Sequence, residues 1–317
     1  MTTRAPVLLL FLALAACVGR PPERPHAPML QSPVELHVLL PLSGDLAPNG
    51  AIQRDVVARA VVALNESRAP ADRPLQAVLH DCGSTHDDAA ATAAALIRTG
   101  VSAFIGPADP TTAFGLAEHL DRTDTLVVLP DAGEFPFDIG GPSTVAMLPP
   151  TALRGHVLLT AALRKEPTAA TVALVRTPGT QSEGAAEVAL STAVARGLVP
   201  TLEDEADVRI LQADTPPPSD VQVRVGSHTL TIPELSPKWR DPALPMDAYW
   251  ARDERATGAT YDAVVGLGRV LRRQPRADAD SLRRALLDDS WEGVFGAVRF
   301  ASAGPSGAAF AHPPEAR

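Results

Sequence analysis

The segment from Asp109 to Thr112 reads Asp-Pro-Thr-Thr and combines residue types that can bind an anion. Asp109 followed by Pro110 is a helix N-cap with the residue that is favoured at the first helical position. The first turn of a helix leaves backbone N–H groups without partners, and the hydroxyls of Thr111 and Thr112 add donors beside them. This combination predicts a site for a carboxylate. Ordinary capping threonines are an equally weighted alternative, because most helices have such residues and few bind ligands.

Two runs of acidic residues and histidine could suggest a metal site, His80-Asp81-Cys82 and His86-Asp87-Asp88. The first ends a predicted strand with alternating side-chain directions, and the second begins a predicted helix, where acidic residues suit the dipole. Neither has the ligand spacing of a known metal site, and the acidic loop with Glu134 and Asp138 is expected to be solvated. The sequence also has no Gly-x-Ser-x-Gly, phosphate-loop or His-Glu-x-x-His motif. We expect no metal, no cofactor and no enzymatic activity.

The amino terminus has an apolar run, Val7 to Ala16, that ends at Cys17. The run follows Arg4 and is too short to cross a bilayer, which needs about 20 apolar residues, so it fits a secretory signal peptide. Leu14-Ala15-Ala16-Cys17 resembles the bacterial lipobox, in which the signal is cut before the cysteine and its sulfur receives a lipid. We expect a signal peptide at residues 1–16, with Cys17 lipidated. A plain signal peptide with a chance cysteine is the alternative.

The remaining composition limits the partners of the chain. Residues 17–34 contain a Pro-rich, polar stretch that predicts an extended spacer, so the body would be tethered outside the cytoplasm. Val18 resembles outer-membrane sorting in a cell with two membranes, because an inner-membrane signal usually has aspartate there. The net charge of −9 argues against nucleic-acid binding. Cys82, the second of two cysteines, is expected to be a buried thiol.

Strand and helix patterns alternate along the front half of the chain. Asn49-Gly50 is expected to break the chain before a helix with one apolar face, and Thr85 with Asp88 forms a capping-box pattern. Helices between strands predict a parallel, doubly wound sheet, an α/β fold. The expected strands are residues 35–42, 75–82, 101–106 and 125–130, and the expected helices are residues 51–65, 87–98 and 111–120.

The pattern resumes after Pro150 and then weakens. Between residues 202 and 250 prolines interrupt the chain, and residues 221–232 alternate with period two around Gly226-Ser227, which predicts a β-hairpin. We expect helices at residues 152–165, 182–196, 259–273 and 280–289, and strands at residues 171–176 and 295–300.

Several of these segments, taken in order, resemble the type I periplasmic binding proteins, and most closely the leucine/isoleucine/valine-binding branch. They are VLLPLSGDLAPNG, LQAVLHDCGSTHDDAAATAAALI, GVSAFIGPADPTT, LVVLPDAG, TYDAVVGLGRVL and WEGVFGAVRFASAG. The resemblance implies two Rossmann-like, doubly wound lobes with a ligand held between them. The expected division is residues 35–149 plus about 253–290 in the first lobe, 150–252 plus about 291–305 in the second, and a tail at 306–317.

Ligands of open parallel sheets bind beyond the carboxyl ends of the strands, where the loops SGDLAPNG, GPADPTT and PDAGEF would gather. In the family, a serine-rich version of the Thr111-Thr112 turn holds the ligand's carboxylate. Asn49 and Gln181 correspond to positions where the family often has an aromatic residue over the ligand, which indicates a smaller or more polar ligand, or none. The expected ligand-binding residues are Ser43, Asn49, Thr111, Thr112, Asp131, Ala132, Gly133 and Gln181, and the aspartate could pair with an ammonium group.

One part of the family's pattern does not fit this chain. Between Pro200 and Tyr261 the family has one or two further βα units, so the second lobe is expected to be trimmed. Our leading hypothesis is a lipid-anchored solute-binding protein that delivers a small ligand such as an amino acid to an ABC permease by hinge closure. The alternative is a non-transport envelope lipoprotein that uses the same fold to bind another protein, as activators of cell-wall synthases do.

Overall fold

The larger of the two main sheets is mostly parallel. The computed structural model describes residues 32–120, 123–132, 143–148, 151–175, 183–211, 222–231, 246–294, 296–303 and 308–311. The strand order of this sheet is β13-β14-β5-β4-β3-β1-β2, and only β13 pairs antiparallel. Its strands are β1 (Val34–Leu40), β2 (Leu75–Asp81), β3 (Ala103–Ile105), β4 (Leu126–Asp131), β5 (Thr144–Leu148), β13 (Ala301–Ala303) and β14 (Ala308–Phe310).

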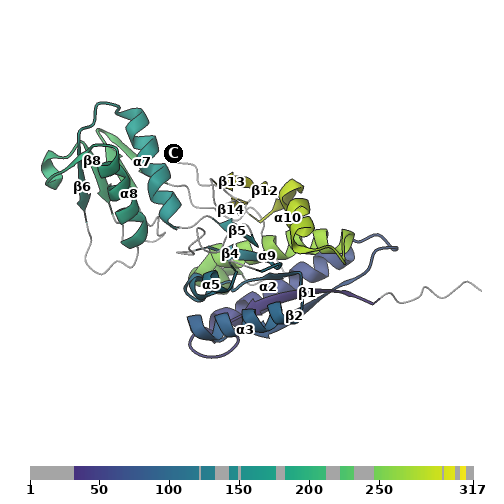
Figure 1. The fold of residues 1–317 in the computed structure, drawn as a ribbon. Coiled ribbons are helices and arrows are strands. Elements are labelled where there is room, and N and C mark those ends of the chain that lie inside the picture. Colours follow the sequence, from purple (N-terminus) through teal and green to yellow (C-terminus); the bar gives the residue numbers. More distant parts are fainter. Residues whose placement is uncertain are drawn as a thin grey trace, which may run out of the picture. The chain divides into compact units, whose positions relative to one another are not determined.

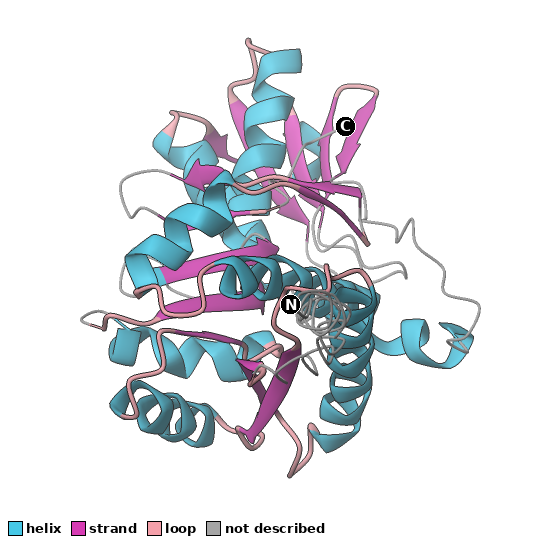
Figure 2. Cartoon of the chain, turned by 90° about the vertical axis from the view of Figure 1, so that its right-hand side faces the viewer, coloured by secondary structure: helices cyan, strands magenta, loops and turns pink. Residues whose placement is uncertain are grey.

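Helices cover both faces of this sheet, as an alternating strand pattern requires (Figures 1 and 2). In β1, Leu36, Val38 and Leu40 belong to one core, while Leu39 between them belongs to the other. The first core contains residues of α2 (Ala47–Glu66), α9 (Met246–Arg273) and α10 (Ala279–Asp288). The second contains residues of α3 (His86–Arg98) and of the short elements α4 (Pro110–Ala113), η2 (Phe114–Leu116) and α5 (Ala117–Leu120). The predicted doubly wound α/β arrangement is therefore confirmed.

Three details differ from the expected pattern. Asn49 and Gly50 do not break the chain but lie in the first turn of α2. The helix expected over residues 111–120 is divided into α4, η2 and α5. The end of the chain, expected in the second lobe from about residue 291, instead joins the larger sheet. β14 pairs with β5, and Trp291 with Val298, in the small hairpin of β11 (Trp291–Gly293) and β12 (Gly296–Val298), packs in the core of that sheet.

The smaller sheet has the strand order β10-β9-β8-β6-β7. Its strands are β6 (Thr171–Val175), β7 (Val199–Pro200), β8 (Val208–Leu211), β9 (Gln222–Val225) and β10 (His228–Thr231). Helices α7 (Thr151–Lys165) and α8 (Glu183–Ala195) pack on it, and η4 (Glu203–Glu205) connects β7 to β8. The hairpin predicted around Gly226-Ser227 is present as β9 and β10.

Residues 1–31 lie outside the described residues, and with them the signal peptide, Cys17 and most of the spacer. Along the described part of the chain, no helix combines the length and the apolar character needed to cross a membrane.

Candidate functional site

The candidate site lies at the carboxyl edge of the larger sheet. Strands β1, β2, β3 and β4 are parallel, so the loops that follow them lie at the same edge. The chain runs from β1 to β2 on one side and from β3 to β4 on the other, which makes the gap between β1 and β3 a topological switch point. Ligands of open α/β sheets bind at this type of position.

One carboxylate oxygen fixes the loop after β1. Asp81 Oδ1 accepts hydrogen bonds from the backbone N–H groups of Leu42 at 3.0 Å, Ser43 at 3.2 Å and Gly83 at 3.0 Å. Burial raises the pKa of Asp81, but the hydrogen bonds from Gly83, Ser43 and Leu42 outweigh it, so the pKa is lowered. Asp81 thus acts as a clamp on two neighbouring loops.

A second residue joins the same two loops. The hydroxyl of Ser84 donates to the carbonyl oxygen of Ser43 at 2.7 Å and accepts from the N–H of Leu46 at 2.9 Å. Gly44, with a φ of +73°, allows this close approach, since a Cβ there would lie 2.5 Å from Ser84 Oγ. The loop that contains Ser43 is therefore preorganised, while Ser43 itself is exposed.

The start of α2 packs directly on this loop. A Cβ on Gly50 would lie 1.9 Å from the carbonyl oxygen of Pro41, so only glycine fits this contact. The contact explains why glycine occurs inside the first helical turn instead of ending the helix. Asn49 precedes it and is half-buried at the same edge of the sheet.

The Asp-Pro-Thr-Thr turn uses some of its own donors. The backbone N–H of Thr112 donates to Asp109 Oδ1 at 3.2 Å, and the Thr112 hydroxyl donates to the Asp109 carbonyl oxygen at 2.9 Å. Thr112 is 1% exposed. This geometry favours the capping alternative for Thr112, because both of its donors are engaged inside the turn. Thr111 lies beside it in the four-residue helix α4.

The electrostatic character of this edge is acidic. Burial raises the pKa of the Cys82 thiol to about 12, and the carboxylates of Asp81, Asp109 and Asp88 reinforce the rise. Cys82 is buried, as expected from the sequence. No arginine or lysine occurs in the loops at residues 41–46, 82–85, 106–109 and 131–132, while Asp45 and Asp131 add two further carboxylates. A negative edge favours the cationic group of a ligand over its carboxylate.

The remaining predicted residues lie as follows. Asp131 ends β4 and is half-buried, and Ala132 after it is fully buried. Gly133, Gln181, Glu134 and Asp138 lie outside the described residues. The structure therefore brings Ser43, Asn49, Thr111, Thr112 and Asp131 to the carboxyl edge of one sheet.

The residues that position the loops were not identified from the sequence. The sequence places Asp81 only in a candidate metal motif, and within the described ranges no cluster of three metal-ligating side chains is found. Its neighbour His80 instead contacts His37, with Nε2 3.0 Å from Nδ1 of His37. The only sequence signal was an aspartate at the end of a buried strand, followed by small polar residues that could receive its hydrogen bonds.

Comparison with known proteins identifies the family. The profile of the family described as periplasmic binding protein matches residues 33–213, which is more than half of the chain. The chain belongs to the periplasmic binding protein family. In a sequence search, no curated protein matches it.

Solved structures of periplasmic binding proteins show the same type I fold. The branched-chain amino acid substrate-binding protein LivJ from Streptococcus pneumoniae, solved with isoleucine, has a TM-score of 0.53 and 12% identity, covering 88% of this chain and 94% of that one. A putative branched-chain amino acid ABC transporter protein from Rhodospirillum rubrum has a TM-score of 0.59 and 17% identity, covering 85% and 93%. A solute-binding protein from Rhodopseudomonas palustris, solved with 3,4-dihydroxybenzoic acid, has a TM-score of 0.55 and 14% identity, covering 87% and 90%. At such identities the likeness establishes the fold and not the ligand.

Proposed function

We propose that this periplasmic binding protein is a lipid-anchored carrier that delivers a small solute with an ammonium group, such as an amino acid, to an ABC permease. The acidic carboxyl edge of the larger sheet is the observation that carries this proposal. Four aspartates lie in or at the ends of its loops, Asp45, Asp81, Asp109 and Asp131, without a lysine or arginine among them. Asp81 is engaged with backbone N–H groups, and Asp109 with Thr112.

Asp131 is the residue that we assign to the ammonium group. It ends β4, which neighbours β3 at the switch point, and it is half-buried, so its carboxylate interacts with a cation more strongly than a fully solvated one does. Ser43 and Asn49 supply neutral hydrogen-bonding groups from the preorganised loop and from the first turn of α2. Thr111 is the remaining candidate for the ligand's carboxylate, with Thr112 holding the turn in place. Gly133 and Gln181 complete the proposed set.

The mechanism would be that of a two-lobed binder. A ligand that contacts both lobes binds the closed form more tightly than the open form. The difference between these two affinities sets how far the ligand shifts the protein towards the closed form. The permease would then recognise the closed form. No catalytic step is part of this proposal.

The test is a thermal-shift screen of the purified protein with amino acids, small amines and hydroxybenzoates. A true ligand at a hundredfold its dissociation constant stabilises the protein by about 2.7 kcal/mol. Asp131→Asn should weaken an ammonium ligand by about tenfold or more, the value of a charge-assisted hydrogen bond. Asp124→Asn, an exposed aspartate before the same strand, is the matched control and should leave affinity unchanged. If hydroxybenzoates bind and amines do not, the ammonium assignment is wrong.

A second candidate is the envelope protein that binds another protein. The observation in its favour is the small second sheet, whose connection from β7 to β8 is the single 3-10 turn η4 instead of a full helix. Absence of any stabilising solute, together with a defined protein partner, would favour this candidate over solute transport.

A further inference from the structure

The described helices of the smaller sheet pack on one of its faces. Its core contains Leu158 and Leu159 of α7 and Ala186 and Ala189 of α8. The strand residues in that core point to the same face of the sheet, because along each strand they occupy alternate positions. These strand residues are Val172, Val208, Ile210, Val223, Val225 and Leu230. Figure 1 shows α7 and α8 on the same side of β6 and β8. The residues between them along each strand point to the opposite face.

We call this opposite surface the open face and define it by Thr171, Val199, Arg209, Arg224 and Thr229; Ala173 has the same side-chain direction but is buried. Strand register places them together: Val199 pairs with Thr171, Ala173 with Arg209, Arg209 with Arg224, and Arg224 with Thr229. A parallel crossover usually contains a helix that would cover such a face. Here the chain passes from β7 to β8 through η4 alone.

The open face has two arginines directly opposite each other. Arg209 and Arg224 are cross-strand partners on antiparallel strands, which places their Cβ atoms about 4.5–5.5 Å apart, and like charges in this position are destabilising. Arg209 Nε donates to the carbonyl oxygen of Glu203 at 2.7 Å, which orients its guanidinium. Arg224 is exposed and has no hydrogen bond or ion pair within the described part of the chain. An anion between the two guanidinium groups would remove the repulsion.

Apolar side chains and hydroxyl groups are also exposed on the strands and turns of this sheet. Val199 is 61% exposed on the open face, and Leu202, which follows β7, is 75% exposed. Thr229 adds an exposed side chain beside Arg224. On the same face, the Thr171 hydroxyl donates to Asp207 Oδ2 at 2.8 Å, so that carboxylate already has a partner. A surface with two cations, exposed aliphatic side chains and hydroxyls is typical of a protein-binding patch.

We propose that the open face binds an acidic segment of a partner protein, whose Asp or Glu carboxylates are held by Arg209 and Arg224. The flanking charges select this occupant over an extended polyanion. Glu203, Asp204, Glu205 and Asp207 adjoin the arginine pair, and the chain has a net charge of −9, so an anionic bilayer or a nucleic acid would be repelled. A short acidic segment can place its carboxylates between the arginines and avoid these residues. The proposal concerns the smaller sheet alone and does not depend on the solute site.

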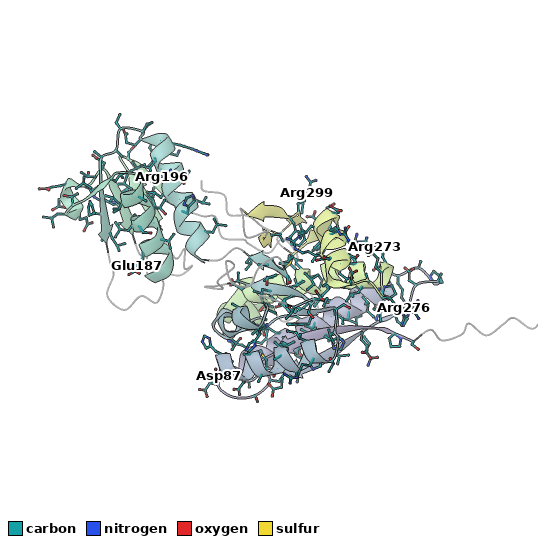
Figure 3. All side chains as sticks on the ribbon, viewed as in Figure 1. Asp87, Glu187, Arg196, Arg273, Arg276 and Arg299 are labelled. Atoms are coloured by element: carbon teal, nitrogen blue, oxygen red, sulfur yellow. The ribbon has the colours of Figure 1, made fainter. Side chains whose placement is uncertain are left out.

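The first experiment measures binding of a short fluorescent peptide, with two glutamates in an otherwise neutral sequence, to the full chain at low and high salt by anisotropy. The double charge reversal Arg209→Glu with Arg224→Glu should weaken binding by about tenfold or more, as expected for two charge-assisted contacts. The matched control reverses Arg276 and Arg299, which are exposed on the body formed by the larger sheet and are labelled in Figure 3. The control should keep the affinity of the parent. Equal loss in both variants would overturn the proposal, because net charge alone would then explain binding.

The second experiment places a photo-crosslinking amino acid at Thr229 of the full chain in its native cell. The proposal requires a crosslink to an acidic segment of another protein, and this crosslink should disappear in the Arg209→Glu, Arg224→Glu variant but persist in the control. Crosslinks confined to the chain itself would show that its own residues cover the face, and would overturn the proposal. Binding of phosphatidylglycerol vesicles in place of the peptide, lost in the same variant, would overturn the choice of a protein partner.

Discussion

At the scale of single residues, Asp81 fixes the geometry of the candidate site with one carboxylate oxygen. Asp81→Ala removes the acceptor of three backbone N–H groups at an exposed site, where water replaces part of the lost interaction, so we expect a loss of about 0.5–1.5 kcal/mol in the free energy of unfolding. Urea denaturation at neutral pH measures this loss. Asp88→Ala in the first turn of α3 is a useful comparison, because it removes a local contact to the N-cap residue Thr85 without loosening the first loop. An unchanged stability for Asp81→Ala would contradict the clamp.

The contribution of Asp81 to the free energy of unfolding depends on pH. Because the pKa of Asp81 is lowered in the folded protein, its stabilisation is present above the unfolded value of about 4 and is lost as the pH falls through the folded value. Asp81→Asn removes the titrating group and should flatten this part of the acid-unfolding curve.

His37 and His80 make the stability of the protein depend on pH in a higher range than Asp81 does. Burial lowers the pKa of both His37 and His80; Glu35 partly offsets this for His37, while His37 adds to the lowering for His80. The unfolded chain therefore binds protons first as the pH falls below about 6.5, and stability decreases from there to the folded pKa values. We expect His80→Gln to show a smaller drop in unfolding free energy between pH 7.5 and 5 than the parent. His228→Gln, at an exposed position on β10, is the control and should keep the full drop.

At the scale of elements, the start of α2 depends on one glycine. Gly50→Ala would place a methyl group 1.9 Å from the carbonyl oxygen of Pro41, so the helix must shift away from the loop after β1. Overpacking of this kind costs about 1–3 kcal/mol, and the shift should also weaken solute binding, because it moves Ser43 and Asn49. Denaturation and ligand titration measure the two effects. Asn49→Ala is the control, since it should affect binding without the loss of stability.

Local patterns predicted most elements of the fold but not the order of the strands. The alternating strands and the capping pair Thr85 and Asp88 were readable from short segments, and the structure has the hydrogen bond from the Asp88 N–H to Thr85 Oγ1 at 3.1 Å. In contrast, β14 pairs with β5 across more than 150 intervening residues, and nothing in either segment encodes that pairing. The loop clamp was missed for the same reason, since Asp81 and the N–H groups of Leu42 and Ser43 meet only when β1 and β2 pair.

At the scale of the whole molecule, the two sheets differ in how completely their faces are covered. The larger sheet has helices on both faces, as a doubly wound fold requires, and presents an acidic edge with a preorganised loop. The smaller sheet has a core on one face and an arginine pair on the other. We propose solute binding at the carboxyl edge of the larger sheet and protein binding at the open face, so separate variants should remove one function without the other. A double variant should lose both effects additively, because sites without shared partners act independently.

Attachment to the membrane is also a property of the whole molecule. The apolar run Val7 to Ala16 is shorter than the roughly 20 residues that span a bilayer, so a lipid on Cys17 is the expected anchor. Cys17→Ser should prevent lipidation and move the protein from the membrane fraction to the soluble extracytoplasmic fraction, measured by fractionation and immunoblotting. Cys82→Ser is the matched control, because this buried thiol plays no part in the anchor and the variant should stay with the membrane. Membrane attachment of the Cys17→Ser variant, with solute binding unchanged, would show that another segment holds the protein and that the lipid anchor is wrong.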